Sequence, residues 1–101
     1  MKVKAVAQDN VVSVKILIQH VMETGRRKDE SGKIVPAHYI TEVTAQYKGE
    51  MVFHAELGPG ISKDPYLAFK FTGGSVGETL HISSVDSKGG TETADSVISA
   101  V

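Results

Sequence analysis

The feature that most constrains the fold is a regular alternation of apolar and polar residues. In the segment Val11–His20, every second residue is β-branched: Val12, Val14, Ile16 and Ile18. Side chains of a β-strand point alternately to its two faces, and β-branched residues suit a pleated, half-buried surface. The segment therefore predicts a strand with one face turned to a core.

The same alternation recurs along the chain, between turn signals rich in glycine, proline and aspartate. Six further strands are expected, at Val3–Ala7, Tyr39–Tyr47, Met51–Leu57, Tyr66–Phe71, Thr79–Val85 and the more polar, edge-like Thr91–Ile98. Within the second of these, alternation places Val43 with Ala45 on one face and Ile40 on the other. Met51 and Phe53 are expected to share a face of the next strand. Lys48-Gly49 between them predicts a two-residue type I′ hairpin turn.

Seven short strands without a segment of helical period predict an all-β fold. We expect one domain over residues 1–101, built as an immunoglobulin-like antiparallel β-sandwich of about seven strands. A chain of this length has material for one core and not for two. The exception to the regular pattern is the long connection at 21–37, and loops of this length are often functional.

Composition excludes several classes of function. The chain has no cysteine, so it forms no disulfide and offers no thiolate as nucleophile or metal ligand. Its formal charge of −1 argues against general nucleic-acid binding. No apolar run is long enough to predict a membrane span, and Met1–Ala5 leads into no apolar segment, so we expect no signal peptide of its own.

The four histidines, His20, His38, His54 and His81, lack the spacings of common metal motifs. We favour scattered histidines, although a sandwich could gather distant ones into a three-histidine centre. The Gly-rich string at 73–77 lacks the Lys-Ser/Thr that follows in a phosphate-binding loop. No serine sits in a nucleophile elbow. We therefore expect no catalytic residue, no metal ligand and no cofactor.

The long loop and two tyrosines are the candidate interaction residues. Arg26, Arg27 and Lys28 could steer an anion such as thiosulfate or an acidic partner, or form a solvated loop with the acids that follow. Tyr39 and Tyr66 lie where strands begin, and exposed aromatic residues there could anchor an interface or serve the fold. The residues expected to face a partner are Met22, Glu23, Arg26, Arg27, Lys28, Asp29, Tyr39 and Tyr66.

Several stretches resemble the SoxZ family of the thiosulfate-oxidising Sox system. They are Ile18-x-His20-x-Met22-Glu23-Thr24-Gly25-x-Arg27-Lys28-Asp29, Gly32-Lys33-Ile34-Val35-Pro36, Tyr47-Lys48-Gly49-x-x-Val52-Phe53-x-Ala55 and Pro65-Tyr66-Leu67-x-Phe69. The final third departs from the family, whose Trp-x-Asp-x-x-Gly is replaced by Val85-Asp86-Ser87-Lys88-Gly89, and the Trp is missing.

The resemblance implies a non-catalytic subunit that pairs with SoxY as a heterodimer. In that family SoxY carries sulfur intermediates on a cysteine in a flexible C-terminal arm, and the pair contacts other Sox enzymes transiently. The resemblance further implies a periplasmic protein exported together with signal-bearing SoxY. The isolated chain could also self-associate. Two other functions stay open from the residues: a free-standing immunoglobulin-like binding or adhesion module, and a small metalloenzyme that uses the histidines.

Overall fold

The computed structural model describes residues 1–101 and contains strands but no helix. The strands are β1 (Lys2–Gln8), β2 (Val11–Leu17), β3 (Ile40–Tyr47), β4 (Glu50–Glu56), β5 (Tyr66–Thr72), β6 (Thr79–Asp86), β7 (Thr91–Val97) and β8 (Ser99–Ala100). There is accordingly no helix of the length and hydropathy that crossing a membrane requires.

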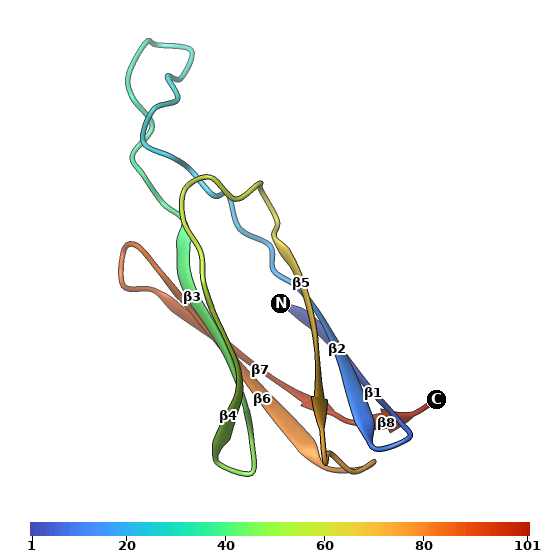
Figure 1. Ribbon diagram of the computed structural model, residues 1–101. Helices are drawn as coiled ribbons and strands as arrows, with labels where there is room; N and C mark the ends of the chain where they lie inside the picture. Colours follow the sequence, from blue (N-terminus) through green and yellow to red (C-terminus); the bar gives the residue numbers. More distant parts are fainter.

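Two four-stranded sheets face each other (Figure 1). Their strand orders are β5-β2-β1-β8 and β4-β3-β6-β7, and every pair is antiparallel except the short β1–β8 pair. This arrangement corresponds to that of immunoglobulin-like sandwiches. The strands β1, β2 and β5 occupy the places of strands A, B and E, and β4, β3, β6 and β7 occupy those of C′, C, F and G. The predicted all-β sandwich is confirmed, and β7 lies at a sheet edge as expected. The two-residue β8 was not predicted.

The core lies between the sheets and takes its residues from alternating positions. Its fully buried side chains include Val12, Val14, Ile16, Ile18, Ile40, Val43, Leu80, Ile82 and Ile98. Aromatic residues extend the core toward β4 and β5, where the rings of Phe53 and Phe69 stack with their centroids 4.2 Å apart. Both sheets therefore rely on one shared apolar interior.

Two irregularities correct the expected alternation. A register shift between Ile40 and Glu42 turns Ile40 into the core, on the same side as Val43. A second shift opposite Ala45 and Gln46 leaves Met51 57% exposed, although its neighbour Phe53 packs against the core. An extra residue in one strand reverses the side-chain alternation beyond it, so strict period-two reading was wrong at both positions.

The long connection between β2 and β3 projects beyond one end of the sandwich (Figure 1). It was expected to lack regular structure, but isolated β-bridges join Glu23 to His38 and Lys28 to Ile34. The loop is thus a loosely paired excursion with its base fastened to the sandwich. At the opposite end, Lys48 and Gly49 have φ angles of 51° and 80°, which fit the predicted type I′ turn.

Candidate functional site

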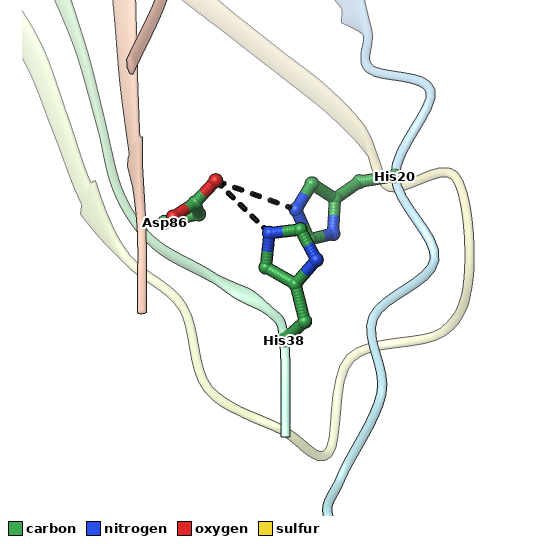
Figure 2. Close-up of side chains that lie close together, drawn as sticks. All are labelled: His20, His38 and Asp86. Atoms are coloured by element: carbon green, nitrogen blue, oxygen red, sulfur yellow. Dashed lines mark hydrogen bonds and ion pairs between the residues drawn. The ribbon is translucent and has the colours of Figure 1, made fainter. Parts of the chain in front are cut away.

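The structure brings His20, His38 and Asp86 together at the end of the sandwich from which the long loop departs (Figure 2). We call these three residues the His–Asp cluster. His20 follows β2, where the pairing of β2 with β5 continues past the strand end. The Ile18 amide donates to the Pro65 carbonyl, and the His20 amide donates to Asp64 Oδ1 at 2.9 Å. These bonds fix the backbone that carries the His20 ring.

The other two members are positioned by the loop base and by the β6–β7 turn. His38 exchanges backbone hydrogen bonds with Glu23, at 2.7 and 3.0 Å. Asp86 ends β6, and its Oδ1 accepts the amides of Lys88 and Gly90 at 2.9 and 2.8 Å. The turn therefore holds one carboxylate oxygen and leaves Oδ2 directed at the two histidines.

Within the cluster, Asp86 Oδ2 is the shared atom. It lies 3.1 Å from His38 Nε2, a hydrogen bond that the ring nitrogen donates, and 4.0 Å from His20 Nε2 (Figure 2). The two imidazole rings pack edge to face with their centroids 4.5 Å apart. Burial, followed by the neighbouring His38, lowers the pKa of His20, while the hydrogen bond from His38 and those from the turn amides lower the pKa of Asp86.

The hydrogen bonds of His20 define its ring. Its Nδ1 accepts the Met22 amide at 3.1 Å, so in the neutral ring the proton resides on Nε2. That Nε2 is buried and has no hydrogen-bond partner. Buried polar atoms are nearly always paired, and the carboxylate that this N–H faces, Asp86 Oδ2, lies 4.0 Å away.

The expectation of scattered histidines holds for two of the four. His54 pairs with Glu42 at 3.2 Å, and His81 contacts Asp95, each on an exposed part of the β4-β3-β6-β7 sheet. It is wrong for His20 and His38, which converge across 18 positions of sequence and meet an aspartate further on. No spacing motif could have signalled this, because the three residues come from three different segments.

Several of the predicted partner-facing loop residues bond to one another. Arg27 binds Glu23 with Nη2 2.8 Å from Oε1, and this bond lowers the pKa of Glu23. Asp29 Oδ1 accepts from Ser31 and from the Lys33 amide, so it organises the loop tip. Arg26 and Lys28 are exposed and make no ion pair. Lys33 is likewise exposed and has no ion pair, so these three are the cations of the loop that remain available to another molecule.

The remaining predicted residues differ in exposure. Met22 is only 6% exposed and packs in the core, where its sulfur accepts the Ile40 amide, so its side chain is not on the surface. Tyr39 is half-buried against the core, and Tyr66 is 58% exposed. Contact with a partner stays a prediction for this set.

Sequence reasoning missed a segregation of charge between the two outer sheet faces. The outward positions of β1, β2 and β5 carry four exposed lysines, here called the lysine face: Lys2, Lys4, Lys15 and Lys70. The outward positions of the other sheet carry the acidic face: Glu42, Glu56 and Asp95. No lysine of the first group has an acidic partner within ion-pair distance. Tyr66 lies beside Leu17 at one corner of the lysine face.

The family comparison decides which proteins this chain is related to. The family described as sulphur oxidation protein SoxZ matches residues 1–97. The chain belongs to the SoxZ family. No curated protein compared with it gives a match. As a SoxZ-family member it has a role in the Sox sulfur-oxidation system and is part of a Sox protein complex. The family tryptophan that is missing near Val85 does not disturb the closing strands, since Val85 pairs with Thr91 in the regular β6–β7 ladder.

Proposed function

We propose that the chain is the non-catalytic subunit of a SoxYZ sulfur carrier, pairing with SoxY as a heterodimer. The family match over residues 1–97 carries the proposal. The absence of cysteine supports it, because a sulfur adduct of the carrier must then reside on the partner. The chain serves as a folded support for the partner's cysteine arm, and other Sox enzymes dock on the pair transiently.

The place of action proposed here is the periplasm. The chain is exported in complex with SoxY, which bears the signal, so folding and pairing both precede transport. A sandwich without disulfides suits this route, since it reaches its fold in a reducing compartment. Fusing a reporter to this chain tests the route: periplasmic signal is expected only when SoxY with its leader is co-expressed.

Two basic surfaces support the docking of proteins. One is the loop tip, where Arg26 and Lys28 are exposed and unpaired; the other is the lysine face with Tyr66 at its corner. Clustered charge of one sign steers association and selects partners of complementary charge. We assign the contact with SoxY to the projecting loop together with Tyr66. The lysine face is assigned to the other Sox enzymes, which bind transiently.

Co-purification tests the pairing. The chain and SoxY, co-expressed with a tag on one of them, should elute together as a 1:1 complex, and a cysteine-reactive probe should label SoxY alone. Elution of the two as separate species would contradict the proposal. A monomer that instead binds a polymer tightly would point to a free-standing binding module.

Charge-reversal variants distinguish the roles of the two surfaces. The double variant Arg26→Glu with Lys28→Glu should weaken pairing at least tenfold, because both side chains are unpaired on the loop. The matched double variant Lys4→Glu with Lys70→Glu, on the lysine face, should leave pairing within about twofold and slow turnover with the other Sox enzymes. The reverse pattern would move the partner contact to the sheet.

A further inference from the structure

We propose that His20, His38 and Asp86 form a binding site for one divalent transition-metal ion of the zinc class. The three side chains reach one point from the ends of β2, the long loop and β6 (Figure 2). Imidazole nitrogen and carboxylate oxygen are the ligands that zinc and its neighbours in the first transition row accept. The proposal rests on the cluster alone and is independent of the proposed function.

The spacing of the three ligand atoms fits a single ion. They lie within 4.8 Å of one another, with Asp86 Oδ2 3.1 Å from His38 Nε2 and 4.0 Å from His20 Nε2. Zinc bonds of about 2.0–2.1 Å in tetrahedral geometry separate neighbouring ligands by roughly 3.4 Å. The observed separations lie on both sides of that value, so sub-ångström shifts of the side chains suffice.

The buried Nε2 of His20 supplies an observation independent of spacing. It has no partner, and 4.0 Å to Asp86 is too long for a direct hydrogen bond. Unpaired buried atoms call for a water or an ion. A water there would accept from His20 Nε2–H and donate to Asp86 Oδ2, whereas an ion would be held by Oδ2 and by both imidazoles once each ring proton has moved to Nδ1.

The carboxylate is already oriented for such a role. Asp86 Oδ1 accepts the Lys88 and Gly90 amides, which fixes the plane of the group and leaves Oδ2 facing the two imidazole rings. Outer hydrogen bonds of this kind set the direction of metal-binding carboxylates and raise affinity.

Binding has two structural costs, and the second provides a signature. His38 Nε2 now donates to Asp86 Oδ2, so this ring must move its proton to Nδ1 and give up that hydrogen bond when both atoms bind the ion. A metal on Nε2 of His20 needs the ring proton on Nδ1, and Nδ1 now accepts the Met22 amide. That hydrogen bond must break when the ion binds. Met22 adjoins Glu23, whose backbone pairs with His38 at the base of the long loop. The ion therefore alters the environment of the loop base as well as its three ligands.

Calorimetry with zinc tests the site on the full chain. After treatment with a chelator, titration with Zn²⁺ alone in a weakly coordinating buffer should give a 1:1 isotherm. His20→Ala and His38→Ala should each weaken binding at least tenfold. His54→Ala and His81→Ala remove histidines that also pair with a single acid, and they should change affinity less than twofold. Absence of binding, or equal losses in all four variants, overturns the proposal.

Nuclear magnetic resonance locates the ion. On addition of Zn²⁺, the ring nitrogens of His20 and His38 should shift, and the Met22 amide should exchange faster with solvent. Asp86→Asn keeps an oxygen for the turn amides, so it should remain folded while losing at least tenfold in affinity. Zinc binding that leaves both rings and the Met22 amide unchanged would place the ion elsewhere, and the proposal would be wrong.

Discussion

The two sheets have matching inner faces and opposite outer ones. Inside, β2 and β6 contribute equivalent rows of buried aliphatic residues, such as Ile16 and Ile82. Outside, one sheet presents the lysine face and the other the acidic face. On each, two like charges stand directly opposite across strands: Lys4 with Lys15, and Glu42 with Glu56. Such pairs destabilise a sheet, so the outer faces are shaped by something other than the stability of the fold.

The largest expected effect tests whether the inner faces are equivalent. Ile16→Ala and Ile82→Ala should each lower the free energy of unfolding by about 2–5 kcal/mol, because both side chains are 0% exposed and leave a cavity in one shared core. Urea denaturation measures both losses. The outward-facing control Thr79→Ala should change stability by less than about 0.5 kcal/mol. A small loss for only one isoleucine would mean that the sheets do not depend on the same interior.

The inner faces were the part of the fold that sequence could predict. Alternation identified Val12, Val14, Ile16 and Ile18 correctly, because burial imposes a period of two on a regular strand. It failed at Ile40, where a bulge changes the phase, and bulges leave no compositional mark here. Local patterning thus describes a strand only as far as its pairing stays regular.

The site and the outer faces depend on distance between segments, which a single sequence does not contain. His20 and Asp86 are 66 positions apart, and only the packing of β2 against β6 reveals their proximity. Part of the lysine face could be predicted, because alternation already places Lys2 and Lys4 on one side of β1. That lysines of neighbouring strands also meet there follows only from the register, which sets Lys4 opposite Lys15.

The next effect distinguishes a structural carboxylate from those of the acidic face. Asp86→Ala, measured in the presence of a chelator, should lower the free energy of unfolding by more than the loss of an exposed carboxylate does, because two turn amides lose their acceptor. Asp95→Ala removes an exposed carboxylate of the same sheet and should cost less than about 1 kcal/mol. Equal costs in thermal or urea unfolding would remove the distinction.

A pH series compares an ion-paired carboxyl next to the start of β6 with the unpaired lysines of the lysine face. Glu78 binds Lys48 at 2.7 Å and the Tyr47 hydroxyl, and these contacts lower its pKa from 4.5 to about 2. A carboxyl whose pKa is depressed by folding stabilises the protein above its unfolded pKa and loses that contribution as pH falls through the folded value. The stability difference between wild type and Glu78→Gln should therefore be constant above pH 5 and shrink toward pH 2.

The lysine face offers the matched control for that series. Its lysines have no acidic partner, so Lys4→Gln should retain the wild-type loss of stability between pH 5 and pH 2. Urea midpoints collected at unit intervals of pH would show the contrast. A wild-type profile for Glu78→Gln would mean that the ion pair does not persist in solution.

The smallest expected effect tests the like-charged pairs on the two outer faces. Lys4→Glu and Glu56→Lys each convert a like-charged pair into an opposite one, with Lys15 and Glu42 respectively. Each should raise the free energy of unfolding by about 0.2–1 kcal/mol. The gain should vanish in 1 M salt, where the screening length is about 3 Å. Lys2→Glu is the control, because Lys2 lies opposite Leu17 and not opposite a lysine. Lys4→Glu could raise stability and at the same time slow turnover with the Sox enzymes. In that case the repulsion between Lys4 and Lys15 is kept because docking needs both charges. If stability and turnover both stay at the wild-type value, the lysine face is not a docking surface.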